Sequence, residues 1–487
     1  MRITALLAFL FSASAAWAGA VLPQRTYSLT PSMFGAYGDG VHDDTTALQA
    51  TLTAGAAQNL KVDLQGYPYL TGALSLTGSA PLMIDGQGSW LKAKSGTGTV
   101  LSIQNNPNYF SVQNITIQAQ GNAQNCLNTS NSTYAGAQVN QFINIKCFGP
   151  WGIGWIAAGN NDTFFDNITI NAANGLTPNA STSTSSNVLN FASVPSWVST
   201  AIANETVYVT DSTNYLAIAP GTHITAVSST TITLSANVTA TVNSGDLIYI
   251  GSGIALQCNS CGGGHMRMIS PEIFNGTISG GWQNVTIVDG VDTGYEFTLA
   301  DENSLDAEGG YHYPSISTGN IFQIDSGIDV TSISIVGGRW ENYYTNGSII
   351  GGPGKLGGYE NIVGSFTFVG SHIFTSDSAT GVTLINSSVG CASANPIQCT
   401  VRLIDGWIDT TEVSIASTSK VAVLSENAVG TMLPSSTVAN LPTCGTNFQY
   451  MLRAVTDATS PTYGGTLTGG GSTPALAMCV GSSWLAH

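Results

Sequence analysis

The chain is short of charged residues. Asp, Glu, Lys and Arg together make up 8% of its 487 residues, whereas about 25% is usual for globular proteins. Basic residues are the scarcest, with 12 Lys and Arg against 28 Asp and Glu and a formal net charge of −16. A strongly acidic chain repels phosphate groups, so we expect neither nucleic acid nor an anionic membrane as a partner. The same acidity makes a polyanionic substrate harder to attract.

Long apolar runs are also absent. The first 18 residues have the pattern of a secretory signal peptide, with a positive Arg2, an apolar stretch from Leu6 to Phe11 and a small-residue cleavage site at Ala16 to Ala18. This stretch is too short to span a membrane, and no later segment approaches 18 apolar residues. We therefore expect a secreted protein, extracellular or periplasmic, without membrane insertion and with a mature net charge of about −17.

Cysteine is infrequent but even in number. All eight cysteines follow the signal peptide, and an oxidising compartment permits disulfides. A zinc or redox site is the less favoured interpretation, because the single CxxC pair has neither a second CxxC nor a tandem His pair beside it. Sequence proximity predicts the pairs Cys126–Cys147, Cys258–Cys261, Cys391–Cys399 and Cys444–Cys479.

The most informative segment is the run FGAYGDGVHDDTTALQA at positions 34–50. Gly38 and Gly40 provide turn conformations with positive φ, and Asp43 or Asp44 can cap the helix that follows. A helix here would have a short apolar stripe and a glycine suited to its C-terminus. These residues are Ala47, Leu48, Leu52 and Gly55.

This run resembles the N-terminal signature of the pectate-lyase-like superfamily, which includes rhamnogalacturonase- and epimerase-type enzymes and phage tailspikes. The resemblance implies an all-β chain folded as a single-stranded right-handed parallel β-helix, with the helix covering its N-terminal end. It identifies the fold and leaves the reaction open. Asp43 and Asp44 look like a catalytic pair, but helix capping explains them fully.

Short runs of alternating apolar residues recur along the rest of the chain, about 15 to 35 residues apart where they are consecutive. A β-sandwich would also contain many short strands, but the N-terminal signature favours β-helix coils. The runs lie at 112–117, 142–145, 165–170, 282–287, 333–336, 366–369, 382–385 and 401–404.

An asparagine lies in several of these runs, as at Asn114, Asn167 and Asn284. Each begins an Asn-x-Thr triplet, so N-glycosylation is one interpretation. We favour the other interpretation, a ladder of asparagine side chains stacked between successive coils.

Two segments depart from this rhythm. Tight alternating strands predict a small inserted β module, and a different pattern near the end predicts a small C-terminal β module. Either module could bind glycans or be purely structural. The predicted organisation is a signal peptide at 1–18, the cap and first β-helix part at 31–193, the insert at 194–252, the second β-helix part at 253–434 and the C-terminal module at 435–487.

Acidic residues are concentrated in one region. Seven of the 28 lie within the 20 positions 289–308, with aromatic residues beside them. Glycoside hydrolysis uses one carboxylic acid to protonate the leaving oxygen and a second carboxylate to activate water or attack carbon, while aromatic rings stack on sugars. The candidate catalytic residues are Asp301, Glu302, Asp306, Glu308 and Glu341. The candidate substrate-binding residues are Tyr295, Tyr311, His312, Arg339 and Trp340.

Other interpretations of this region stay open. It could be a solvated acidic loop or a structural calcium site built from the same oxygens. For Arg339, a plain ion pair with Glu341 is favoured over orienting a substrate hydroxyl. Lyase chemistry would need a base and a cation beside a uronate, and the chain offers few basic residues for either role.

These observations predict an exported, polysaccharide-active β-helix protein that cleaves glycosidic bonds by carboxylate catalysis, with a hydrolase favoured over a lyase. The alternative is a non-catalytic glycan-binding surface protein or tailspike-like adhesin. No cofactor is required, although calcium stays open. A homotrimer is compatible with the tailspike resemblance, but no coiled-coil heptads demand it.

Overall fold

The computed structural model describes most of the chain. The predicted signal peptide at 1–18 and the residues Asn284, Asp301 and Glu302 lie outside the described part. None of the described helices is long and apolar enough to cross a membrane. The described residues are 27–78, 81–105, 109–130, 140–157, 159, 163–204, 206–261, 266–282, 285–298, 303–356, 364–375, 379–391, 399–409, 413–414, 421–426, 435–441, 443–445 and 452–487.

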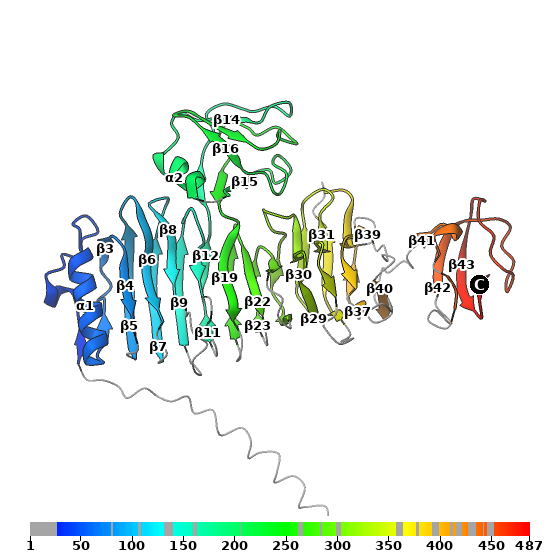
Figure 1. Ribbon diagram of the computed structural model, residues 1–487. Helices are drawn as coiled ribbons and strands as arrows, with labels where there is room; N and C mark the ends of the chain where they lie inside the picture. Colours follow the sequence, from blue (N-terminus) through cyan, green and yellow to red (C-terminus); the bar gives the residue numbers. More distant parts are fainter. Residues whose placement is uncertain are drawn as a thin grey trace, which may run out of the picture.

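The main body is a parallel β-helix, which confirms the predicted fold class (Figure 1). Successive coils of the chain return to the same two long sheets, and each strand pairs in parallel with the strand one coil away. Side chains alternate between the interior and the surface, and the interior ones form one continuous apolar core.

The larger sheet contains 23 strands in the described part of the chain. It is bent along its length, so most coils cross it twice, once before the bend and once after it. Its strands are β1 (Ser28–Leu29), β2 (Lys61–Asp63), β3 (Pro68–Thr71), β5 (Leu82–Ala93), β7 (Phe110–Gln118), β9 (Asn140–Phe148), β11 (Thr163–Asp166), β12 (Thr169–Asn171), β20 (Met266–Ile269), β21 (Glu272–Phe274), β23 (Val285–Val288), β24 (Val291–Asp292), β26 (Asn303–Glu308), β27 (Tyr311–His312), β29 (Asp329–Val336), β30 (Arg339–Asn342), β32 (Lys355–Leu356), β33 (Gly364–Val369), β34 (His372–Thr375), β36 (Gly390–Cys391), β37 (Cys399–Ile404), β38 (Trp407–Ile408) and β40 (Ala422–Glu426).

The smaller sheet closes each coil and contains 11 strands among the described residues. Its strands are β4 (Leu74–Thr77), β6 (Thr97–Gln104), β8 (Ala123–Asn128), β10 (Trp155–Ile156), β19 (Ile254–Cys261), β22 (Thr277–Trp282), β25 (Tyr295–Phe297), β28 (Asn320–Ile324), β31 (Ser348–Gly351), β35 (Val382–Ile385) and β39 (Val413–Ser414).

The bend of the larger sheet falls at residues with a left-handed backbone. In three successive coils these are Asn114, Asn144 and Asn167, with φ of 56°, 53° and 50°. The side-chain amide of Asn144 donates to Asn114 at 3.1 Å, and that of Asn167 donates to Asn144 at 3.4 Å. Asparagine tolerates this backbone and offers both a donor and an acceptor. The asparagine ladder is therefore confirmed for Asn114 and Asn167.

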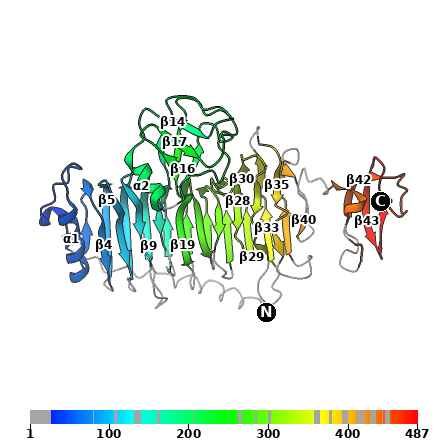
Figure 2. The same cartoon turned by 45° about the horizontal axis from the view of Figure 1, so that its top comes forward.

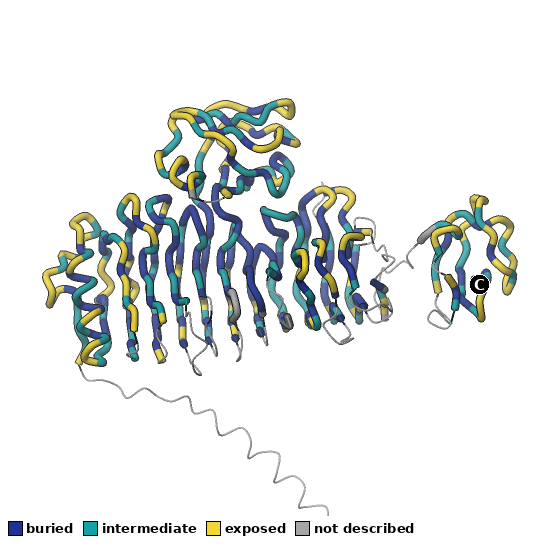
Figure 3. Tube along the Cα trace, viewed as in Figure 1, coloured by how far each residue is buried: buried dark blue, intermediate teal, exposed yellow. Residues whose placement is uncertain are grey.

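Aromatic rings fill the interior of the first half. Phe142 stacks on Phe165 in the next coil at 5.3 Å between ring centres, and Trp155 packs edge-on against Phe142 at 4.4 Å. All three residues are fully buried. Figure 3 shows this pattern as buried tube along the strands, with the exposed segments mostly at the turns.

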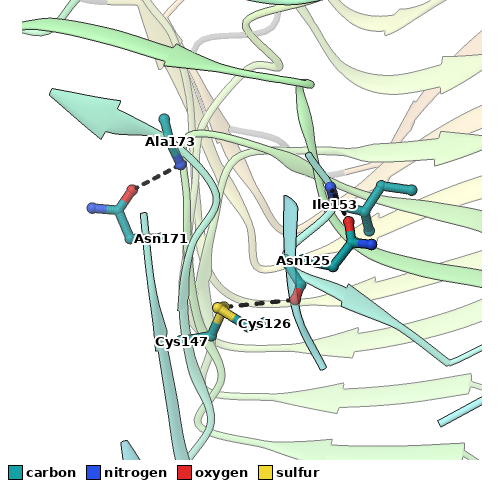
Figure 4. The surroundings of a disulfide bond; sticks show 7 residues. Asn125, Cys126, Cys147, Ile153, Asn171 and Ala173 are labelled. Carbon is teal, nitrogen blue, oxygen red and sulfur yellow. Dashed lines mark hydrogen bonds between the residues drawn. A yellow bond between two sulfur atoms is a disulfide. The ribbon is translucent and has the colours of Figure 1, made fainter. Parts of the chain in front are cut away.

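Three of the predicted disulfides are confirmed: Cys126–Cys147, Cys391–Cys399 and Cys444–Cys479. The first joins β8 to β9, so it ties the two sheets together across the buried interior (Figure 4). Cys258 is also disulfide-bonded, but the side chain of Cys261, its predicted partner, is outside the described part. The fourth pairing stays a prediction.

The N-terminal end is covered by a short 3-10 helix, η1 (Pro31–Phe34), and by α1 (Thr45–Gln58) (Figure 1). The turn before α1 has positive φ at Gly38 and Gly40, as predicted. Asp43 accepts the Thr45 N–H at the start of α1. Asp44, in contrast, does not cap the helix with its side chain, because its buried carboxylate accepts the N–H groups of Tyr37 and Gly38.

Gly55 does not end α1, which corrects the prediction. The helix continues to Gln58 and ends at Asn59, which has φ 54°. Gly55 instead allows close packing, because a Cβ at this position would lie 2.5 Å from the side chain of Val62.

The insert is longer than predicted and is not purely β. Its antiparallel sheets begin about 20 residues before position 194, since β13 pairs with β18, and it contains one helix. It rises from the middle of the β-helix (Figure 2) and has its own apolar core. Its elements are β13 (Asn174–Leu176), β14 (Val188–Asn190), α2 (Ser196–Asn204), β15 (Tyr208–Asp211), β16 (Ile224–Val227), β17 (Thr231–Leu234) and β18 (Ile248–Gly251).

The C-terminal module is a separate small β-sheet of four strands with its own core. Its elements are β41 (Ser435–Ser436), η4 (Val438–Asn440), β42 (Leu452–Ala458), β43 (Thr473–Val480) and β44 (Ser483–Ala486).

Candidate functional site

The predicted catalytic residues are divided between two faces of the β-helix. Asp306 and Glu308 lie on β26, before the bend, and both are exposed. Glu341 lies on β30, after the bend. The structure therefore does not bring Glu341 together with Asp306 and Glu308. The other two candidates, Asp301 and Glu302, are outside the described residues.

Three of the predicted substrate-binding residues point into the interior. Tyr295, His312 and Trp340 are almost fully buried. Nδ1 of His312 lies 2.9 Å from the carboxylate of Asp292, which also accepts the Tyr295 hydroxyl. The His312 ring stacks on Trp340 at 3.8 Å. A polysaccharide outside the coil cannot contact these rings, so they do not bind substrate as predicted.

Tyr311 and Arg339 point outward. Strand register places Tyr311 beside Arg339, Arg339 beside His372, and His372 beside Trp407 in four successive coils. Trp407 is 44% exposed, and its ring centre lies 4.1 Å from that of His372. We call the outward side of β27, β30, β34 and β38 the β30 face.

A second column lies two residues further along the same strands. Glu341 pairs with Phe374, and the Asp409 N–H donates to the Ile373 carbonyl at 3.0 Å, which continues the ladder. Phe374 therefore lies between two carboxylates, Glu341 and Asp409. Neighbouring strands are about 4.8 Å apart, so the two acidic residues stand roughly 10 Å apart along the β-helix.

Aromatic rings hold the charged groups of the β30 face. The Tyr311 hydroxyl donates a short hydrogen bond to the Glu341 carboxylate. The Arg339 guanidinium lies over the rings of Tyr311 and Phe374, at 4.8 and 5.0 Å from their centres. Among the described residues no ion pair joins Arg339 to Glu341, so that prediction is wrong. Cation–π contacts with the two rings take its place.

Further tyrosines surround Glu341. Burial, followed by neighbours that include the Glu341 charge, raises the pKa of Tyr313 and Tyr343 on the β-helix and of Tyr215 in the insert. Burial and then the contact with Glu341 raise the pKa of Tyr311 as well. All four hydroxyls therefore stay protonated at neutral pH and can donate hydrogen bonds.

The β30 face combines groups suited to binding and cleaving a sugar chain. Two carboxylates lie on either side of an aromatic ring. Acid and base catalysis on a glycosidic bond uses a pair of carboxyl groups, and aromatic rings can stack on sugars. Burial and then Arg339 lower the pKa of His372, against the opposing effect of Asp409. This histidine is therefore neutral near pH 7 and can both donate and accept a hydrogen bond.

The sequence reasoning missed Phe374, Trp407 and Asp409. A signal for them exists, because three segments have a Gly immediately before or within the bend: VGGRWEN at 336–342, VGSHIFT at 369–375 and IDGWID at 404–409. Alignment of these segments at the bend places Asp409 in register with Glu341.

A second pair of carboxylates lies on the smaller sheet, beneath the insert. Glu296 on β25 accepts the Thr277 hydroxyl at 3.4 Å. Burial, and then the Asp325 carboxylate, raise the pKa of Glu296 to about 7. After burial, the same two carboxylates raise the pKa of Tyr208 in the insert. This pair therefore belongs to the contact between the smaller sheet and the insert.

Metal binding has no support in the described geometry. Within the described ranges, no group of three or more His, Cys, Asp or Glu side chains is arranged to hold a metal ion. Calcium stays a prediction from the sequence.

No protein-family model and no curated protein sequence matches this chain. Among solved structures, the A-module of the mannuronan C-5 epimerase AlgE6 from Azotobacter vinelandii is 12% identical, covers 83% of this chain and 100% of its own, and has a TM-score of 0.43. The tailspike protein of Acinetobacter phage vB_ApiP_P1 is 13% identical over 94% of this chain and 78% of its own, with a TM-score of 0.42. Endo-xylogalacturonan hydrolase from Aspergillus tubingensis is 10% identical over 82% and 98%, with a TM-score of 0.36.

At these identities the likeness concerns architecture alone, and the fold is established by the chain's own strand register. Its parallel coils, N-terminal capping helix and asparagine-lined bend agree with the signature at 34–50. Together they give this chain a parallel β-helix fold, the architecture that the N-terminal signature predicts.

Proposed function

We propose that the protein binds a polysaccharide on the β30 face and hydrolyses its glycosidic bonds, with Glu341 and Asp409 as the two carboxylates. The observation that carries this proposal is the register of β27, β30, β34 and β38. It aligns aromatic rings, a guanidinium and two carboxylates on one exposed surface.

Each group has a distinct role in this proposal. Trp407 and Phe374 provide apolar surfaces for stacking on sugar rings. The hydrogen bond from Tyr311 orients the Glu341 carboxylate. In this proposal Glu341 activates water, and Asp409 protonates the leaving oxygen. The two residues stand two strands apart, roughly 10 Å between their backbones. This spacing is nearer to that of inverting enzymes than to the about 5 Å of retaining ones, so we expect inversion at the anomeric carbon.

The second candidate is glycan binding without cleavage. One observation favours it. Glu341 already accepts a hydrogen bond from Tyr311, and Arg339 already packs on two rings, so these charged groups have structural partners and need no catalytic role. An adhesin or tailspike-like protein would use the same residues to hold a chain. A lyase is the least favoured, because it needs a cation beside a uronate and a base beside its C5 proton.

The test uses purified protein with alginate, polygalacturonate, xylan and dextran, each with and without calcium. New reducing ends without ultraviolet-absorbing unsaturated products support hydrolysis. Both signals together would show a lyase and contradict the assigned roles. Retention on one immobilised polymer without any product would favour the binding function.

We further propose export to an oxidising compartment, because three disulfides lie within or beside the folded cores. The tailspike resemblance is compatible with a homotrimer, and the oligomeric state stays open. Light scattering of the purified protein would measure its mass directly.

A further inference from the structure

The insert is docked on the β-helix beside the β30 face. The Gly221 N–H donates to the Ile316 carbonyl at 2.9 Å. Pro220 packs so closely on Gly319 that a Cβ there would lie 2.7 Å from the proline ring. The hydroxyls of Thr210 and Tyr344 lie 3.4 Å apart. These contacts fix the segment 210–221 of the insert to the coils that carry β27 to β31.

A second contact fixes the insert several coils away. Gly121, in the turn after β7, is covered by Trp197 of α2, since a Cβ at Gly121 would lie 2.6 Å from the indole nitrogen. The insert is therefore held at two points along the β-helix. A side chain of the insert near either contact therefore has a defined position relative to the β30 face.

Tyr215 is such a side chain. It lies in the turn after β15, where the Asp211 carboxylate accepts the N–H groups of Thr213 and Asn214 at 2.9 and 3.0 Å and so shapes the turn. One side of the Tyr215 ring stacks on Tyr343 at 4.3 Å and an interplanar angle of 29°. Tyr215 nevertheless stays 38% exposed.

A series of rings links Tyr215 to the carboxylate. The ring centre of Tyr343 lies 5.9 Å from that of Tyr313, and the ring centre of Tyr313 lies 4.7 Å from that of Tyr311. The Tyr311 hydroxyl in turn binds Glu341. The dependence of the pKa values of Tyr215 and Tyr313 on Glu341 agrees with this proximity. The aromatic surface therefore continues from the β30 face onto the insert.

We infer that the insert supplies one sugar-binding subsite, in which the exposed ring of Tyr215 stacks on a sugar unit of the polysaccharide held at Glu341. This inference rests on the proposed function and adds that the substrate is a chain spanning both the β-helix and the insert. Short oligosaccharides that do not reach Tyr215 should bind more weakly than the polymer.

The test is affinity electrophoresis of the full chain in gels containing alginate, polygalacturonate, xylan or dextran. Four variants are compared: Tyr215→Ala, Tyr215→Phe, Tyr215→Leu and Tyr463→Ala. Leucine retains apolar packing on Tyr343 but removes the flat ring. Tyr463, 81% exposed in the C-terminal module, is the matched control.

In the polymer that retards the wild type, Tyr215→Ala and Tyr215→Leu should raise the dissociation constant about three- to tenfold. Tyr215→Phe and Tyr463→Ala should match the wild type. Wild-type retardation in Tyr215→Leu would overturn the inference and leave the proposed function intact. No retardation of the wild type in any of the four gels would contradict the proposed function, and the inference with it.

Discussion

Alternation along a single strand decides which residues of β30 meet solvent. Trp340 and Asn342 are fully buried, so Arg339 and Glu341 project outward. The sequence identifies this strand but not which of its alternate side chains face the interior, because Arg-Trp-Glu fits either choice when the neighbouring coil is unknown. In the structure, Trp340 faces the interior and Glu341 faces the surface.

Glu341→Gln and Asp409→Asn should each lower the rate of polysaccharide cleavage roughly a hundred- to ten-thousandfold while leaving polymer binding nearly unchanged. The amides keep size and shape but cannot transfer a proton. Reducing-end assays measure the rate, and affinity electrophoresis measures binding. Loss of both properties would point to a structural role for these carboxylates.

The same assays test the sequence-based candidates on β26. Asp306→Asn and Glu308→Gln should change the rate less than about twofold, because these residues lie on the other side of the bend from Glu341. A large loss in either variant would return the catalytic assignment to β26.

Glu296 makes stability depend on pH. Burial, and then Asp325, raise its pKa from 4.5 to about 7. A raised carboxyl pKa favours the protonated folded form, so this stabilisation is complete below the unfolded value and is lost as the pH rises through 7. Between about pH 5 and pH 8 the free energy of unfolding should fall on the order of 2 kcal/mol. Denaturant unfolding at several pH values measures this change.

Glu296→Gln is the control for that measurement, because the amide keeps the contact with Thr277 and does not titrate. The variant should flatten the pH dependence. An unchanged slope would assign the effect to another group, such as Asp211, whose pKa is raised to about 6 chiefly by burial.

At the scale of elements, the bend of the larger sheet depends on a single backbone conformation in each coil. Asparagine provides it in three coils of the first half. The later coils use other residues with positive φ, namely Ser270, Asp289, Gly309, Gly337, Gly370 and Asp405. In the first half, the amide side chains also join successive coils. The triplets that suggest glycosylation therefore have a structural explanation at Asn114 and Asn167.

Asn144→Ala should lower the free energy of unfolding by about 2 to 4 kcal/mol, because it removes two side-chain hydrogen bonds and forces alanine into the left-handed region. Asn144→Gly relieves the backbone strain and should cost less, about 1 to 2 kcal/mol. Chemical denaturation compares the two variants. Equal losses would show that the backbone conformation contributes little.

For the whole molecule, the C-terminal module has its own sheet, its own core and the disulfide Cys444–Cys479. A chain ending at residue 434 should therefore retain the β-helix, with a melting temperature within about 2 °C of the full chain. Circular dichroism and calorimetry measure this. A markedly lower melting temperature would show instead that the module protects the last coils.

Much of the architecture could be predicted because local chemistry encodes it. Several features follow from short-range patterns and were confirmed: the turn at Gly38 and Gly40, the runs at 112–117, 142–145 and 165–170, the asparagine ladder at Asn114 and Asn167, and three disulfides. Asp44 and Gly55 were assigned the wrong role because their partners come from the preceding turn and from β2, which helix propensity does not reveal.

The candidate site could not be predicted in the same way. Seven acidic residues cluster in the sequence at 289–308, yet the bend sends Asp306 and Glu308 to one face, and alternation buries Asp292. Asp409 lies 68 positions from Glu341 in the sequence but only two strands away in the sheet. Density of charge along the chain is therefore a poor guide to density of charge on a β-helix.

The sequence by itself determined the class of fold, its N-terminal cap, two asparagines of the ladder at the bend and most of the cysteine pairing. These features depend on backbone preference and on spacing between neighbours. Only the tertiary structure decided which carboxylates share a surface and that Tyr215 of the insert approaches Glu341. In a β-helix, proximity is set by the register of coils, and each coil can include a loop of any length before it returns to the sheet.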